Sequence, residues 1–363
     1  MQTTKKLVYS NTFCLIIQAI IRRVPLFILH KVLLKKKDYA IVLVYHRIAD
    51  LKKDVQLLSV APQKFEEQTI YLKSRFNIIT LQELVRDLKN KKIKKKSLVI
   101  TFDDGYADNL FNAKPILEKH NIPATFFITT DTLNSNREFW WDSLERVFLD
   151  YNLQPLNPID IKINNIRFFK SNITANILES IYKEAYALMR KLSTEDRDAV
   201  LNYFLNWANL GESVRDNYRP LNKSELVKLS LNNLFEVGSH SKSHCSLNKQ
   251  KIDIQKNEIS NSKSMLDNIL SKSIKSFSYP YGTINHYSNN IINIVKESKY
   301  NCGVTTIQRP VYNDTDSFQI PRILVRNWDT CKLENELNRV INHIGVISIL
   351  KQKLKVIKRV LKK

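Results

Sequence analysis

The stretch from Leu98 to Tyr106 reads LVITFDDGY, an apolar run that ends in two adjacent carboxylates and a glycine. The apolar part predicts a buried strand, and functional residues are commonly found just past the carboxyl end of such a strand. Asp103 and Asp104 repel each other there, so another group must offset their charge. A divalent cation would do so if the chain supplies further ligands elsewhere.

Those ligands are expected in a second stretch, residues 235–244, which reads FEVGSHSKSH. His240 and His244 are four residues apart, which places both imidazoles on one side of a helical turn or of a tight loop that leads into a helix. Two imidazoles and one carboxylate leave positions open on a metal ion, as is typical of a catalytic site rather than a structural one.

Strands and helices alternate along much of the chain, which predicts an α/β fold with a parallel sheet or barrel. Strands are expected at 39–47, 98–102, 124–128, 235–239, 276–279, 302–305 and 320–325, and helices from about 62 and over 81–89, 109–120, 252–270 and 288–298. The alternation breaks between 131 and 234, where helices are expected at 176–191 and 194–205. We expect this segment, which lacks a regular strand rhythm, to be a largely helical insertion or cap.

Both ends of the chain are basic and rich in aliphatic residues. The 363 residues carry a net charge of +22, and lysine and arginine are concentrated before residue 38 and after residue 336. We expect basic amphipathic helices at 1–38 and 336–363, which either lie on an anionic membrane surface or pack on the domain. Arg22, Arg23 and Pro25 argue against a spanning helix, and no small-residue site for signal cleavage follows the apolar residues 13–21. The expected location is peripheral, on the cytoplasmic side of the membrane.

The composition is that of a folded protein, with 43% hydrophobic and 25% charged residues. The four cysteines have no CxxC spacing, so free thiols are expected. The excess of positive charge could suit nucleic acid, but no RNA-binding motif, zinc finger or helix-turn-helix is evident. We therefore expect no nucleic-acid partner, and the sequence carries no signal for an oligomeric state.

Four motifs occur in a fixed order: TFDDG at 101–105, PATFF at 123–127, GSHSKSH at 238–244 and YPYG at 279–282. With them the chain resembles the polysaccharide deacetylase family, also called the NodB-homology or carbohydrate esterase 4 group. The resemblance places the deacetylase domain at 39–335, with residues 131–234 inserted. It is greatest for the branch that resembles poly-N-acetylglucosamine deacetylases.

The resemblance implies a deformed (β/α)7-type barrel that hydrolyses acetyl groups from sugars with one divalent metal ion, most often Zn²⁺. Asp104, His240 and His244 match the metal ligands of the family, and Asp103 matches its general base. The backbone N–H of Tyr281 matches the donor to the oxyanion. Such a division of roles suits an amide, because a Lewis acid must polarise its carbonyl while a carboxylate takes the proton of water.

Two further residues are assigned where the chain departs from the common pattern. A late Leu-x-His motif is missing from residues 320–328, so His46 at the end of the first strand is expected to be the general acid, as in the poly-N-acetylglucosamine branch. A capping histidine is the alternative. An arginine before the YPYG motif is also missing, and Arg322 is the expected substitute that orients Asp103, although a surface salt bridge would explain Arg322 equally well.

The expected function is the metal-dependent removal of N-acetyl groups from a cell-envelope polysaccharide or a lipid-linked glycan precursor. A sugar O-deacetylase and a catalytically silent glycan-binding protein are the alternatives. Trp140 and Trp141 either stack on sugar rings or anchor the insertion on the barrel.

Overall fold

The computed structural model describes residues 38–135, 137–149, 157–211 and 214–342. Residues Tyr39–Leu333 form one compact unit, which contains the sheet and the site. The predicted arm at 1–38 lies outside the described residues except for Asp38. Of the predicted helix at 336–363 only residues 336–342 are described, and these are helical. Within the described ranges, no helix has the length and hydropathy needed to cross a membrane.

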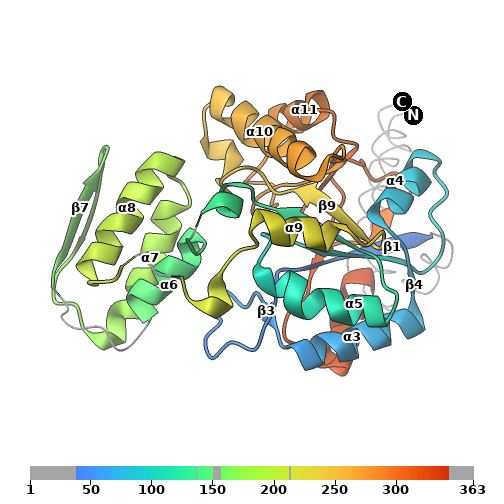
Figure 1. Cartoon of the computed structure of the whole chain (residues 1–363), viewed down its shortest axis with the longest axis horizontal. Helices are drawn as coiled ribbons and strands as arrows, with labels where there is room; N and C mark the ends of the chain where they lie inside the picture. The colour runs from blue at the N-terminus through green and yellow to red at the C-terminus, as the bar shows by residue number, and fades with distance from the viewer. Residues whose placement is uncertain (1–37, 136, 150–156, 212–213, 343–363) are drawn as a thin grey trace, which may run out of the picture. The chain divides into compact units, whose positions relative to one another are not determined.

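A curled, mainly parallel sheet forms the centre of this unit (Figure 1). Its strands, in spatial order, are β11 (Cys302–Val304), β10 (Ser276–Ser278), β9 (Phe235–Ser239), β6 (Ala124–Ile128), β5 (Ser97–Phe102), β1 (Tyr39–Tyr45) and β12 (Val311–Tyr312), the last antiparallel to β1. All six residues of β5 are buried, as expected for a parallel strand that is covered on both faces. The predicted α/β fold is confirmed.

The sheet curls so that the first and last strands meet. β13 (Ile323–Leu324) pairs in parallel with β1, opposite Leu43 and Val44. An isolated bridge between Val304 and Ile320 links β11 to the segment just before β13. The predicted strand at 320–325 is shorter than expected, because Pro321 has no N–H to donate and Arg322 turns inward to the site. The carboxyl ends of the parallel strands gather at one edge, where the site lies.

Helices flank the sheet, and five of them lie at predicted places: α3 (Pro62–Arg75), α4 (Leu81–Lys89), α5 (Lys114–Lys119), α10 (Ile252–Leu270) and α11 (Asn289–Glu297). Helix α9 (Lys223–Ser230) was not predicted. Helix α4 shows why the sequence folds this way. Thr80 and Glu83 form a capping box at its start, and its apolar side chains recur at helical spacing on the buried face. Short strands β2 (Arg47–Ile48), β3 (Ser59–Val60) and β4 (Asn77–Ile78) complete this part.

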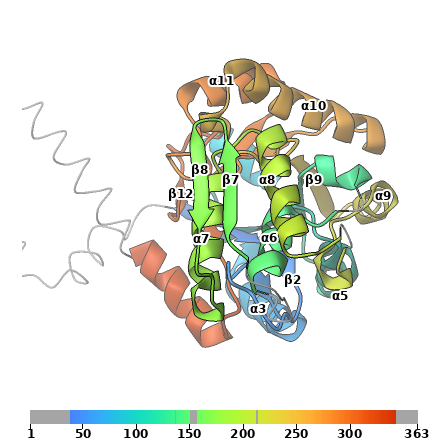
Figure 2. The same cartoon turned by 90° about the vertical axis from the view of Figure 1, so that its left-hand side faces the viewer.

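Residues 131–234 contain α6 (Trp140–Leu149), α7 (Leu178–Met189) and α8 (Thr194–Trp207), with an apolar core of their own. They also contain an antiparallel hairpin of β7 (Ile159–Ile163) and β8 (Ile166–Lys170), which lies beside α7 and α8 (Figure 2). The segment is largely helical, and this hairpin was not predicted from the sequence. Asn164 turns the chain between the two strands in a left-handed conformation, with φ of 51°. The domain boundaries themselves stay a prediction.

Candidate metal centre

Three buried side chains converge at the edge of the sheet. One ligand atom from each of Asp104, His240 and His244 lies within 4.8 Å of the other two. Asp104 Oδ1 is 3.5 Å from His240 Nε2 and 3.6 Å from His244 Nε2. The strand order explains the meeting, because β5 delivers Asp104 and β9 delivers His240, with only β6 between them. His240 and His244 follow Asp104 by 136 and 140 positions in the sequence, and the fold brings all three together.

The two histidines lie on a tight loop and not on a helical turn. Ser241 and His244 both adopt left-handed backbone conformations, with φ of 63° and 54°. The carboxylate of Glu258 on α10 holds this loop, because it accepts hydrogen bonds from the backbone N–H of Lys242 at 3.0 Å and of Ser243 at 2.8 Å. Ser243 Oγ donates to the same carboxylate at 2.7 Å. Sequence reasoning missed Glu258, since it matches no motif and its role depends on the packing of α10.

A backbone carbonyl orients His240. Its Nδ1 lies 2.8 Å from the carbonyl oxygen of Ser278, which accepts the hydrogen bond when Nδ1 carries the proton. Nε2 is then left with its lone pair toward Asp104. This is the arrangement that fixes the tautomer of metal-binding histidines.

The electrostatics of the three residues fit a divalent cation. Burial raises the pKa of Asp104 well above its ordinary value, and the charges of Asp103 and Asp142 raise it further. Burial also lowers the pKa of His240 and, aided by the charge of His240, that of His244. Asp104 Oδ1 and His244 Nδ1 are buried without a hydrogen-bond partner in the described part of the chain. A cation would satisfy the orphaned carboxylate oxygen and two neutral imidazoles at once.

Arg322 forms a bidentate ion pair with Asp103 through both terminal nitrogens of its guanidinium. Arg322 Nη1 donates to Asp103 Oδ1 at 2.7 Å, and Nη2 donates to Oδ2 at 2.6 Å. Ser278 Oγ adds a third hydrogen bond to Oδ2 at 3.2 Å. Burial by itself would raise the pKa of Asp103, but Arg322 and His240 outweigh it and hold this pKa well below its usual range. Arg322 is fully buried, so the alternative of a surface salt bridge is wrong.

His46 follows β1 and interacts electrostatically with Asp103 and His240. Its Nδ1 is buried without a partner among the described residues, so it does not cap a loop carbonyl through that atom. Burial lowers the pKa of His46 to about 4, against the opposing effect of Asp103. The imidazole is therefore neutral at pH 7 in this structure.

Tyr281 lies beside the ligands in a left-handed conformation, with φ of 60°. Its ring packs against that of His244, with 4.7 Å between the ring centroids. Gly282 follows with the same φ, and a Cβ there would stand 2.6 Å from the backbone nitrogen of Thr306. This close approach requires glycine and fixes the course of the turn at Tyr281.

The segment 131–234 contributes side chains that pack against the ligands. The ring of Trp141 lies 4.8 Å from that of His244, and its Nε1 donates to Tyr106 Oη at 2.8 Å. Arg197 donates to the carbonyl of Ser243 at 3.0 Å. Trp140 and Trp141 are 6% and 3% exposed, which agrees with the interpretation that they anchor this segment.

Comparison with known proteins gives consistent results. The family model described as "Polysaccharide deacetylase" matches residues 90–150 and 181–303. The poly-beta-1,6-N-acetyl-D-glucosamine N-deacetylase of Staphylococcus epidermidis is 24% identical over 311 residues, which cover 82% of this chain and 83% of that protein. The protein of the same name from Staphylococcus aureus strain N315 is 26% identical over 303 residues, with 80% of each covered.

Two solved structures share the fold. The Streptococcus pyogenes deacetylase PplD in complex with acetate aligns with a TM-score of 0.55 and 18% identity, over 84% of this chain and 99% of that chain. IcaB from Ammonifex degensii aligns with a TM-score of 0.51 and 16% identity, over 80% and 93%. These findings confirm the predicted family resemblance and the prediction of a hydrolase of the deacetylase type.

Proposed function

Because the chain belongs to the polysaccharide deacetylase family, we propose that it removes N-acetyl groups from amino-sugar units of a cell-envelope polysaccharide or a lipid-linked glycan precursor. The curated relatives support the choice of an N-acetyl group, since both are named N-deacetylases of poly-β-1,6-N-acetyl-D-glucosamine. The observation that carries the proposal is the convergence of Asp104, His240 and His244 beside the Asp103–Arg322 pair.

Asp104, His240 and His244 would hold the metal ion, for which we propose Zn²⁺ because two imidazoles and a carboxylate suit it. A bound divalent metal would polarise the acetyl carbonyl and make water more acidic. Asp103 is proposed to accept the proton of the attacking water. Arg322 keeps this carboxylate ionised and fixes its orientation, and a carboxylate retains further lone pairs for that proton.

The remaining steps use Tyr281 and His46. As the C–O bond forms, the carbonyl oxygen becomes an oxyanion, to which the backbone N–H of Tyr281 is proposed to donate. His46 is proposed to deliver a proton to the sugar nitrogen as the C–N bond breaks, which releases acetate and a free amine. Since burial lowers the pKa of His46 to about 4, we propose that the proton it delivers comes from the attacking water during turnover.

The direct test is acetate release from β-1,6-linked N-acetylglucosamine tetramers by the zinc-loaded protein, with the Asp103→Asn variant and chelator-treated protein as controls. We expect release of acetate together with new amino groups, and a loss of both in the two controls. Release from an O-acetylated sugar ester but not from the tetramer would support the O-deacetylase alternative instead. Binding of the tetramer with no hydrolysis of either substrate would support a silent glycan-binding protein.

The basic ends of the chain lead to a second part of the proposal. We propose that the enzyme associates peripherally with the cytoplasmic face of an anionic membrane, where a lipid-linked substrate would be located. Sedimentation with anionic and neutral liposomes should separate full-length protein from a variant trimmed to residues 39–342. Equal partition of both proteins would contradict the proposed membrane association and would leave the proposed deacetylase activity unaffected.

A further inference from the structure

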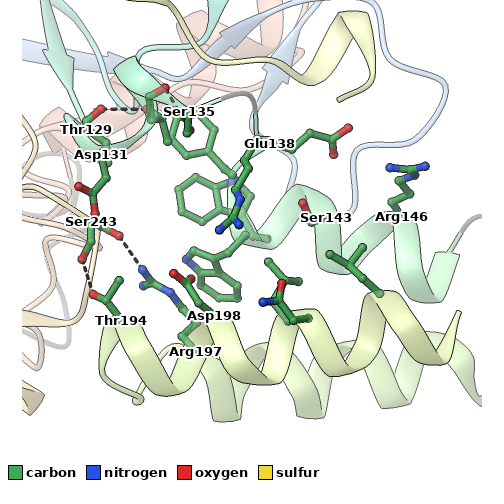
Figure 3. A pocket seen from close by; sticks show the side chains of 18 of the residues that line it. Thr129, Asp131, Ser135, Glu138, Ser143, Arg146, Thr194, Arg197, Asp198 and Ser243 are labelled. Carbon is green, nitrogen blue, oxygen red and sulfur yellow. Dashed lines mark hydrogen bonds between the residues drawn. The ribbon is translucent and has the colours of Figure 1, made fainter. Parts of the chain in front are cut away.

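A cavity of 240 Å³ lies between the loop at 129–135 and the helices α6 and α8 (Figure 3). Among the described residues, those that line it do not include the three expected metal ligands, Asp103, His46 or Tyr281. It is therefore a separate hollow. Nothing in the proposed chemistry uses it, and α6 and α8 both belong to the segment 131–234.

The cavity lining combines an aromatic wall with polar groups. Phe139, Trp140 and Trp141 all contribute to it, and the rings of Phe139 and Trp141 stack with 4.7 Å between centroids and 6° between planes. Hydroxyl and amide groups come from the other sides, among them Ser143 on α6 and Asn202 on α8. These rings are 3%, 6% and 3% exposed and pack largely on one another, so they give the cavity an apolar rim beside the hydrogen-bonding groups, which suits a ligand that has both apolar CH groups and hydroxyls.

The charges in the lining cancel. Three arginines contribute to it, and so do three acidic residues: Arg137, Arg146, Arg197, Asp131, Glu138 and Asp198. A pocket for an anion or for a cation would carry an excess of one sign. The balance favours an uncharged polar ligand.

Two nitrogen donors in this lining have no hydrogen-bond partner. Trp140 Nε1 and Arg197 Nε are both buried and have no hydrogen-bond partner in the described part of the chain. The side chain of Arg197 is only 4% exposed. Buried donors without a partner are uncommon in native proteins and call for an acceptor. Both atoms are buried in this structure, so the indole or the guanidinium has to shift before an acceptor in the cavity can reach them. Sugar hydroxyls and acetamide carbonyls are uncharged acceptors of that kind.

The cavity adjoins the metal centre through two shared residues. Trp141 lines the cavity and also packs on the ring of His244. Ser243 lines it as well, and directly precedes His244 in the chain. Ser243 Oγ and Thr194 Oγ1 lie 2.9 Å apart, so the loop of the metal ligands is joined to α8 at this wall (Figure 3).

We propose that this cavity is a subsite that binds one N-acetylated pyranose ring of the glycan, next to the ring whose acetyl group reaches the metal centre. The volume of 240 Å³ is somewhat below the roughly 300–1,000 Å³ of pockets for drug-sized ligands, which agrees with a single ring. The inference rests on the proposed function, from which it takes the glycan. It assigns to the segment 131–234 the role of selecting a chain of sugars over a single sugar.

The proposal is tested by placing a large side chain at an exposed position that lines the cavity. Asn202 on α8 is exposed and lines the cavity, whereas Asn206, one turn further on the same helix, is exposed and does not line it. We compare Asn202→Phe with Asn206→Phe as the matched control. Steady-state acetate release is measured on the N-acetylglucosamine tetramer and on the monosaccharide, and calorimetry gives the Kd of the tetramer in an Asp103→Asn background.

In Asn202→Phe we expect the KM and the Kd for the tetramer to rise about tenfold or more, with kcat retained and a smaller effect on the monosaccharide. Asn206→Phe should match the unsubstituted protein. If the protein releases acetate but both variants have the same KM and Kd, the subsite is refuted and the proposed function stands. If no acetate is released while Asn202→Phe alone weakens binding of the tetramer, the proposed function fails and the saccharide site is supported.

Discussion

Replacing Arg322 by methionine should expose how strongly the fold depends on the buried pair at the base of the site. Arg322 is fully buried and Asp103 is 1% exposed, and the guanidinium is the source of two short hydrogen bonds to the carboxylate. Methionine preserves much of the volume but leaves Asp103 charged and unpaired. Removal of one partner from a buried ion pair costs about 3–5 kcal/mol, so we expect a loss of that size in the free energy of unfolding at pH 7.

The double variant Asp103→Asn with Arg322→Met separates the charge effect from lost packing. It removes both charges, so it should be more stable than Arg322→Met alone, and the two single effects should not add. Urea unfolding of the metal-free protein, followed by circular dichroism, measures all four members of the cycle. A loss below about 1 kcal/mol in Arg322→Met, or additive single effects, would show that the buried pair is not coupled in this way.

The difference in unfolding free energy between the unsubstituted protein and Arg322→Met should depend on pH with a defined sign. In the unsubstituted protein the pKa of Asp103 is lowered, so the stabilisation from the pair is present above the unfolded pKa of about 3.9 and is lost as the pH falls through the folded pKa. In Arg322→Met burial acts without this partner and raises the pKa of Asp103, so that variant gains relative stability as it takes up a proton in acid. The difference in unfolding free energy between the two proteins should therefore narrow from pH 7 toward pH 4. A difference that stays constant or widens would contradict the assignment.

Three further predictions concern the site. His46→Gln should lower kcat on the tetramer by about 10²–10⁴-fold with the metal content retained, and an unchanged kcat would remove this residue from the mechanism. Tyr281→Phe should leave kcat within a few-fold of the unsubstituted value, because the proposed donor is the backbone N–H. Gly282→Ala should lower kcat by about 10²–10³-fold, because its Cβ would stand 2.6 Å from the backbone nitrogen of Thr306 and displace the turn. Equal kcat values for the two variants would argue against the backbone donor. Glu258→Gln should weaken zinc affinity by about 10–100-fold in a competition titration, since its carboxylate holds the ligand loop, and an affinity equal to that of the unsubstituted protein would show that the loop needs no such anchor.

The parts that the sequence predicted well are those with a local signal. The buried run before Asp103 and the alternation of strands and helices depend on neighbouring residues, so most predicted element boundaries agree with the structure within a few residues. The hairpin β7–β8 also carried a signal, because apolar and polar residues alternate in residues 159–163, and two asparagines follow them. It was missed because helices dominate the surrounding segment.

The contacts that complete the site could not be predicted in the same way. Arg322 meets Asp103 across 219 positions of sequence, and only the curl that brings β13 next to β1 makes the contact. Glu258 and Ser278 act through a helix and a strand end that pack on the ligands. Polar contacts of this kind depend on tertiary packing and leave no pattern in the local sequence.

We propose that Asp104, His240 and His244 together hold one divalent metal ion. The most direct measurement is the metal content per chain after loading with zinc and desalting, compared between the unsubstituted protein, His244→Ala and His120→Ala. His120 pairs with Glu66 near the surface and serves as the matched control. We expect one zinc ion per chain in the unsubstituted protein and in His120→Ala, and a near-complete loss of zinc in His244→Ala. An equal zinc content in all three proteins would contradict it.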